Sequence, residues 1–103
     1  MMTKYLVLYR ADQSAADQMT NSTPEERQAG MEAWMTWAGK AGPALVDFGQ
    51  PVGPVGSADV SVCGYSILET TDADALTALL EDHPHKAMGG SIDVHEMMPP
   101  PGM

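Results

Sequence analysis

The histidines of this chain are concentrated near its end, because all three lie between residues 83 and 95. Imidazole is the side chain that exchanges protons near neutral pH, so most of the acid/base capacity of the protein lies in this segment. Asp93 and His95 are two residues apart in a stretch that predicts a strand, and they should therefore share one face. This spacing makes Asp93 a candidate to orient His95, and it makes His95 or His83 the candidate proton-transfer group.

Two other interpretations of these residues remain open. Same-face neighbours on one strand are about 6.5–7 Å apart, which is too far for a direct hydrogen bond, so Asp93 and His95 could instead form a polar patch at the end of the sheet or at a dimer interface. With His83 and His85 they also have the ligand types of a transition-metal site. However, a cationic His83 at a helix carboxyl end has an ordinary capping role, and we therefore expect no metal.

Four further residues are candidates for ligand binding. Arg10 is the cation most suited to point into a pocket, where it would attract an acidic small molecule. Tyr9 provides a polar group on the same strand, and His85 follows the proline after His83. Trp34 could form a stacking wall, although its three-residue spacing from Trp37 on a helix is more typical of core packing.

Composition and charge limit the classes of partner. The chain carries 14 acidic and 5 basic residues, a net charge of −9, so we expect neither nucleic acid nor an anionic membrane surface as a partner. The only cysteine, Cys63, lies in a strand-like run and should be a buried, inert thiol. No apolar run resembles a secretory leader or a membrane span, and we expect a cytoplasmic protein.

The pattern of residues predicts four strands and two helices. Ala11 to Ser22 is polar and loop-like, whereas Thr23-Pro24-Glu25-Glu26 is a strong helix start with a capping box. The expected strands span residues 4–10, 44–49, 60–68 and 91–97, and the expected helices run from 24 to about 41 and from about 71 to 83, where Pro84 ends the second. Residues 1–98 should form one domain, followed by a proline-rich tail at 99–103.

The order β-α-β-β-α-β predicts an α+β, ferredoxin-like fold, in which a four-stranded antiparallel sheet carries two helices on one face. The first strand is apolar on both faces, with Tyr5, Val7 and Tyr9 on one and Leu6 and Leu8 on the other. One helical layer covers only one face of a sheet. We therefore expect a homodimer in which a second copy covers the other face.

Several segments together resemble the YCII-related proteins, particularly their DGPF-type branch. These are the opening Lys4-Tyr5-Leu6-Val7-Leu8-Tyr9, the helix start Thr23-Pro24-Glu25-Glu26 and the closing His83-Pro84 followed by Gly89-Gly90-Ser91-Ile92-Asp93-Val94. The resemblance spans nearly the whole chain. It implies a dimeric α/β barrel with a pocket between sheet and helices in each subunit.

Two features of that family are absent from the sequence. The YCII proteins proper carry a histidine soon after the first strand, paired with an aspartate as a proposed catalytic dyad, whereas Ala11 to Ser22 contains no histidine. The Asp-Gly-Pro-Phe tetrapeptide is also missing. The resulting hypothesis is a protein that binds a small organic molecule and that, as an enzyme, would use acid/base chemistry without a cofactor. The alternative is a non-catalytic dimeric interaction or regulatory protein.

Overall fold

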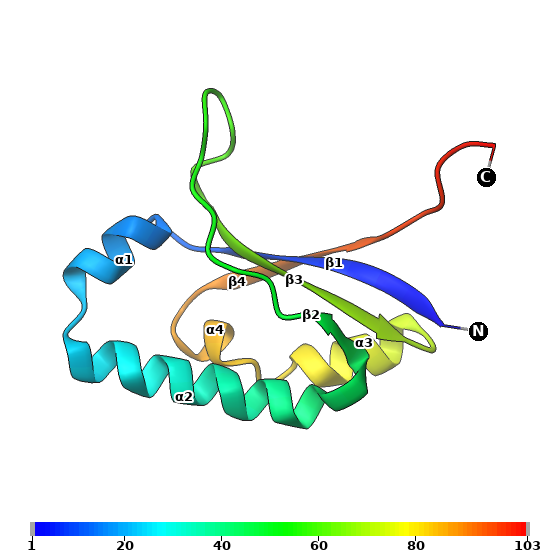
Figure 1. Ribbon diagram of the computed structural model, residues 1–103, viewed down its shortest axis with the longest axis horizontal. Helices are drawn as coiled ribbons and strands as arrows, with labels where there is room; N and C mark the ends of the chain where they lie inside the picture. Colours follow the sequence, from blue (N-terminus) through cyan, green and yellow to red (C-terminus); the bar gives the residue numbers. More distant parts are fainter. Residues whose placement is uncertain (1, 103) are drawn as a thin grey trace.

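The computed structural model describes residues 2–102, which form an α+β fold around one antiparallel sheet (Figure 1). The strands are β1 (Thr3–Arg10), β2 (Leu45–Asp47), β3 (Val62–Thr70) and β4 (Ser91–Glu96). The helices are α1 (Ala15–Asn21), α2 (Pro24–Ala41), α3 (Ala73–Leu80) and α4 (Pro84–Ala87), and a 3₁₀ turn at Gly42–Ala44 joins α2 to β2. The strand order β2-β3-β1-β4 is that of the predicted ferredoxin-like fold, which is thereby confirmed.

The central strand β1 sets the two faces of the sheet. It pairs antiparallel with β3 and with β4, so that Leu8 lies opposite Tyr65 on one side and Asp93 on the other. Tyr5, Val7 and Tyr9 are buried beneath the helices, as the alternating pattern predicts. The intervening side chains face the opposite side, which we call the open face.

Helices α2, α3 and α4 all lie on the same side of the sheet, and α1 lies beyond the end of β1 (Figure 1). The space between these helices and the sheet holds the apolar core. Its buried members are Tyr5, Val7, Tyr9, Trp37, Ala41, Cys63, Leu68, Leu76 and Leu80. The burial of Cys63 and Trp37 agrees with their predicted positions in the core.

Helix α2 begins at the predicted capping box. The Thr23 hydroxyl accepts a hydrogen bond from the Glu26 backbone N–H, and the Glu26 carboxylate accepts one from the Thr23 N–H, each at 3.1 Å. The helix ends at Ala41, where Gly42 adopts a positive φ of 56° and its N–H bonds the Ala38 carbonyl. None of the helices within residues 2–102 combines the length and the apolar character needed to cross a membrane.

Two predictions about secondary structure were wrong. The polar segment Ala11 to Ser22 is not a loop throughout, because Ser14 caps a short helix by accepting a hydrogen bond from the Asp17 N–H at 3.1 Å. This helix, α1, has no buried residue, and the absence of an apolar stripe explains why its sequence resembled a loop.

The second error concerns Pro84, which begins a helix rather than ending one. Helix α3 ends at Leu80, three residues before the predicted end, and Pro84 occupies the first position of α4. Proline is tolerated there because the first helical N–H has no intrahelical partner. His83 is therefore the N-cap of α4 and does not lie at the carboxyl end of α3.

Gly90 permits the close approach of α4 to the start of β4. A Cβ atom at position 90 would lie 2.2 Å from Nε2 of His85, so Gly90→Ala must displace the buried imidazole. We expect this substitution to cost about 1–3 kcal/mol in the free energy of unfolding, measured by urea titration. Gly53→Ala is the matched control, because a Cβ atom at position 53 would meet nothing within 4 Å and its effect should be small. Equal stability of the two variants would contradict this packing.

Candidate functional site

The sheet divides the predicted site residues into two groups. Tyr9, Trp34, His83 and His85 come together on the helix-covered side, where their rings are in contact. Arg10, Asp93 and His95 belong to the open face, because each alternates with inward-facing neighbours along β1 or β4. The predicted trio of His83, Asp93 and His95 is therefore not brought together among the described residues.

His83 is fully buried and carries an unpartnered nitrogen. Its Nδ1 accepts a hydrogen bond from the backbone N–H of His85 at 2.9 Å. A neutral imidazole that accepts at Nδ1 carries its proton on Nε2, so Nε2 is a donor. Among the described residues, Nε2 of His83 is a buried side-chain atom with no hydrogen-bond partner. A buried donor in this state normally has a water or ligand as its partner.

Aromatic rings surround His83. The ring centroids of Trp37, Trp34 and Tyr9 lie 4.3, 4.6 and 4.9 Å from that of His83. Trp34 is half-buried, whereas Tyr9 and Trp37 are buried. Trp37 is also fixed by a 2.8 Å hydrogen bond from its Nε1 to the Leu79 carbonyl. We call the rings of Tyr9, Trp34, Trp37 and His83 the aromatic cluster.

Burial keeps His83 neutral. Desolvation, with smaller contributions from the nearby charges of His85 and Lys86, lowers the pKa of His83 from 6.5 to about 4. The prediction that His83 acts as a cationic helix cap is therefore wrong: its uncharged ring accepts from the start of α4 instead. At neutral pH this side chain can donate a hydrogen bond from Nε2 but is too weak a base to abstract a proton efficiently.

Tyr9 is likewise held as a neutral donor. Its hydroxyl donates to Oγ of Ser66 at 2.8 Å, and that hydroxyl donates to the Phe48 carbonyl at 2.6 Å. Burial raises the pKa of Tyr9 to about 12, although the bond to Ser66 acts in the opposite direction. Sequence reasoning missed Ser66, and the signal was a small polar residue at an inward position of an otherwise apolar strand.

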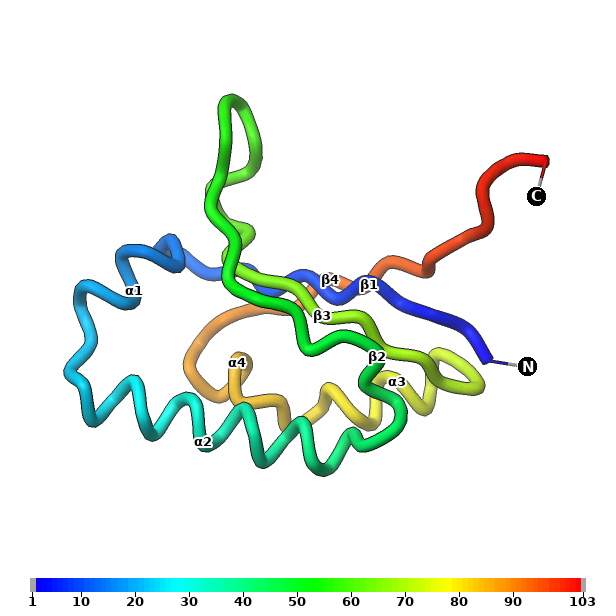
Figure 2. Tube along the Cα trace, in the orientation of Figure 1, coloured from blue at the N-terminus to red at the C-terminus, as the bar shows by residue number. Residues whose placement is uncertain are grey.

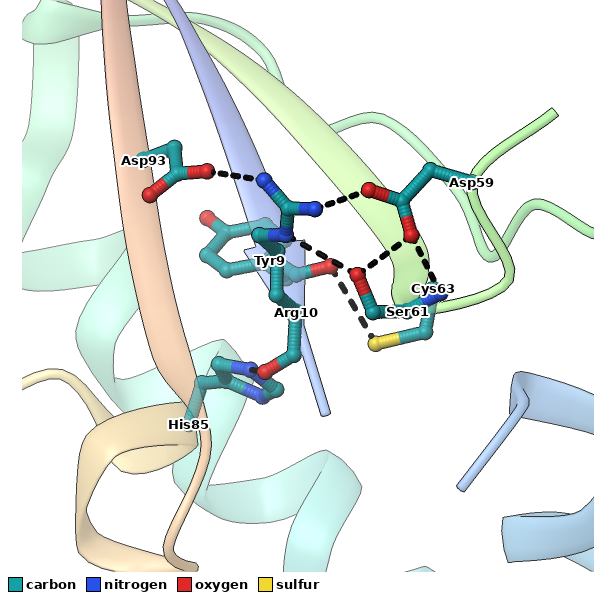
Figure 3. Close-up of polar contacts among 7 residues, drawn as sticks. All are labelled: Tyr9, Arg10, Asp59, Ser61, Cys63, His85 and Asp93. Carbon is teal, nitrogen blue, oxygen red and sulfur yellow. Dashed lines mark hydrogen bonds and ion pairs between the residues drawn. The ribbon is translucent and has the colours of Figure 1, made fainter. Parts of the chain in front are cut away.

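His85 connects the end of β1 to α4. Its Nε2 lies 2.8 Å from the carbonyl oxygen of Arg10, which can only accept, so the ring donates (Figure 3). Tyr9 and His85 rings are in edge contact, with centroids 5.4 Å apart. His85 is thus a buried residue that positions the aromatic cluster relative to β1.

Arg10 forms ion pairs with two carboxylates (Figure 3). Its Nη1 donates to Asp93 at 2.6 Å, its Nη2 pairs with Asp59, and its Nε donates to Oγ of Ser61 at 3.0 Å. The hydrogen bond to Asp93 and the charge of Asp59 raise the pKa of Arg10. Hydrogen bonds from Ser61, followed by the charge of Arg10, lower the pKa of Asp59. An acidic ligand would have to displace a carboxylate to reach this guanidinium.

Asp59 and Ser61 were not among the predicted residues. The signal for them was the Asp-x-Ser spacing at the end of the long loop, where the Ser61 N–H and hydroxyl both donate to Asp59, at 2.9 and 2.7 Å.

Beside Arg10 lies an open hollow of about 240 Å³, lined by Arg10, Ala11, Asp12, Ser61, Gly89 and Ser91. His95 is exposed on the open face, while the carboxylate of Asp93 is engaged by Arg10.

The positions of the His, Cys, Asp and Glu side chains can be compared with the interpretation of His83, His85, Asp93 and His95 as a transition-metal site. Within residues 2–102, no group of three or more His, Cys, Asp or Glu side chains is arranged to hold a metal ion. His83 and His85 lie beneath the sheet, whereas Asp93 and His95 lie on its open face, so these four residues do not converge.

Comparison with known proteins identifies a structural likeness. No protein-family model matches the chain, and no curated protein matches its sequence. A solved structure with a similar fold is 5-chloro-2-hydroxyhydroquinone dehydrochlorinase (TftG) from Burkholderia phenoliruptrix AC1100, in complex with 2,5-dihydroxybenzoquinone. The likeness covers 92% of this chain and 93% of that one, with a TM-score of 0.59 and 14% sequence identity. At this identity the likeness shows the fold and not the activity.

The lowered pKa of His83 predicts a pH dependence of stability. Because the folded state resists protonation, the unfolded state binds more protons between pH 6.5 and about 4, and stability falls as the pH falls through that range. From pH 7 to pH 5 we expect His83 to account for a loss of about 2 kcal/mol, measured by urea unfolding.

His83→Asn provides the comparison, because asparagine can cap α4 but does not titrate. This variant should lose much less stability than the parent chain over the same pH range, even if its stability at pH 7 is lower. An identical pH dependence in both proteins would show that His83 is not the responsible group.

Proposed function

We propose that the protein binds a small, uncharged organic ring compound next to His83, between the sheet and α2. One observation carries this proposal: the Nε2–H of His83 is fully buried, uncharged and without a partner among the described residues. An oxygen atom of a ligand would satisfy that donor, whose unpaired burial otherwise costs about 1–3 kcal/mol.

The aromatic cluster favours a planar ligand. Its rings present flat faces and edges, which contact other rings favourably at centroid distances of about 4.5–7 Å. Both polar groups of the cluster, the His83 imidazole and the Tyr9 hydroxyl, are neutral at pH 7. Such surroundings penalise a charged ligand and accept a neutral one with an acceptor oxygen. The acidic ligand suggested by Arg10 fits these surroundings poorly.

Access to His83 would involve Trp34. Among the rings around His83, Trp34 is the one that is only half-buried, and it stacks with Phe48 at a centroid distance of 6.1 Å. The rings fill the space between sheet and α2, so a ligand must displace one of them. Rotation of Trp34 away from Tyr9 would open a path without moving the sheet.

Two further observations support the binding of a small molecule. The sequence resembles the YCII-related family, whose fold implies a pocket between sheet and helices, and we propose that the chain is a member. The structure of TftG, which has a similar fold, is a complex with a small quinone. If the bound compound is also transformed, His83 would act as a hydrogen-bond donor that polarises a carbonyl, with no cofactor.

A second candidate function, that of a homodimeric interaction protein, is favoured by the open face. Leu6, Leu8, Tyr65 and Ile67 form a half-buried apolar strip there, and none of them belongs to the core beneath the helices. A second copy would cover this strip. In such a dimer Asp93, His95 and Arg10 would be polar groups at the interface, and both candidate functions could be combined in one protein.

Hydroquinone is a suitable neutral probe for the His83 site. We expect it to shift the indole N–H signals of Trp34 and Trp37 in a two-dimensional NMR titration, and His83→Phe, which keeps a ring but removes the donor, should weaken binding about fivefold. The matched control is His95→Phe on the other face of the sheet, which should bind normally. Equal affinity of both variants, or no binding by the parent chain, would contradict the proposed site.

The proposed dimer can be tested by introducing a charge into the apolar strip. Ile67→Glu should convert the protein to monomers in analytical ultracentrifugation, because two buried carboxylates would face each other across the interface. Met35→Glu adds the same charge at an exposed position of α2 and should leave the dimer intact. A parent chain that sediments as a monomer of 11.0 kDa would rule out the dimer.

A further inference from the structure

We propose that two uncharged segments of the chain, which we call arms, extend over a second copy and contact it across the open face. The first is the loop of residues 48–58, and the second is the tail of residues 97–102. This inference rests on the proposed homodimer and adds to it the parts of each subunit that extend over the partner.

Both arms project to the same side of the sheet. The loop, green in Figures 1 and 2, rises from one end of the sheet, and the tail, red, rises from the other, each away from the helices. Contacts with open-face residues agree with the pictures, because Asp59 at the base of the loop pairs with Arg10. The beginning of the tail is fixed at the other end of the sheet, because the Met97 N–H continues the pairing of β4 with β1 by donating to the Lys4 carbonyl at 2.9 Å.

Each arm is anchored at its base and free beyond it. The loop is held by a β-bridge between Pro51 and Gly64 and by a 3.1 Å bond from the Val52 N–H to the Cys63 carbonyl. Farther out, Val55 is 85% exposed, and in the tail Met98 is 75% exposed. Large apolar side chains at the ends of projecting segments gain from contact with another surface.

The arms carry no charge that would oppose a second copy as the occupant. The chain has a net charge of −9, so two copies repel each other. Neither arm contains an acidic, basic or histidine side chain, although 14 acidic residues are present elsewhere. These segments can therefore approach an acidic partner without adding repulsion and without burying an unpaired charge. A strongly basic partner would instead be expected to meet acidic arms.

Proline lowers the entropic cost of docking. The tail contains Pro99, Pro100 and Pro101 in succession, and the loop contains Pro51 and Pro54. Consecutive prolines favour an extended conformation before binding, so less conformational freedom is lost on contact. Both arms are thus suited to lie along a surface rather than to fold into a core.

The apolar strip consists of four side chains on two neighbouring strands. It is bordered on the open face by the charged side chains of Lys4, Glu69 and Asp93. A typical stable interface buries about 800 Å² on each partner. The arms would enlarge the contact with apolar atoms at both ends of the strip, which explains why they rise on this side of the sheet.

The test compares two pairs of exposed methionines by sedimentation velocity. Met97→Gln/Met98→Gln in the tail should raise the dimer dissociation constant about tenfold. Met31→Gln/Met35→Gln on α2 is the matched control, with 60% and 56% exposure against 44% and 75%, and should leave the constant unchanged. Val55→Ser should weaken the dimer through the loop arm in the same direction.

The outcomes separate this inference from the dimer itself. If Ile67→Glu dissociates the protein while the tail pair and Val55→Ser leave the dissociation constant unchanged, the arms are not part of the interface and the proposal is overturned. If the parent chain is monomeric, the dimer proposal fails and the arms fail with it. Equal weakening by the tail pair and the α2 pair would also overturn it, because the effect would then be unspecific.

Discussion

The structure depends on a single strand, β1, which is hydrogen-bonded on both edges and carries apolar side chains on both faces. It is central in the sheet, with β3 on one side and β4 on the other, and its side chains alternate between the two faces. The helices cover the face that carries Tyr5, Val7 and Tyr9. A fold of this size has no second helical layer for Leu6 and Leu8, and this constraint leads to the proposed dimer.

The same alternation separates the polar residues of the protein into an uncharged group beneath the helices and a charged group on the open face. Tyr9 and Arg10 are consecutive, yet Tyr9 joins the aromatic cluster while Arg10 joins two carboxylates on the open face. On one side, desolvation keeps His83 and Tyr9 uncharged and makes them donors. On the other side, ion pairs hold the loop and β4 to the end of β1. The first arrangement favours the binding of a neutral ring compound. The second stabilises the positions of the loop and β4 at the end of β1.

The short connection between α3 and β4 links the two sides. His83 caps α4 and accepts from the His85 N–H, and His85 donates in turn to the Arg10 carbonyl. Gly90 leaves room for that ring against the chain before β4. The segment that places a neutral donor in the aromatic cluster therefore also fixes the end of β1, where Arg10 begins its ion pairs.

The sequence by itself determined the elements and their order. Alternation in β1, the capping box of Thr23 and Glu26, and the apolar stripe of α3 are local patterns, and each produced the predicted element. The order of these elements leaves few compact arrangements, and the ferredoxin-like fold followed. Local signals were weaker where an element has no fully buried residue, as in α1, or where proline has two permitted positions, as at Pro84.

Tertiary structure decided which residues share a site and in what state of charge. Asp93 was a candidate to orient His95, and the register of β1 against β4 places it within reach of Arg10. One interpretation made His83 a cationic helix cap, but complete burial among rings makes it neutral. Strand register and desolvation depend on segments far apart in the chain, and no local spacing of residues encodes them.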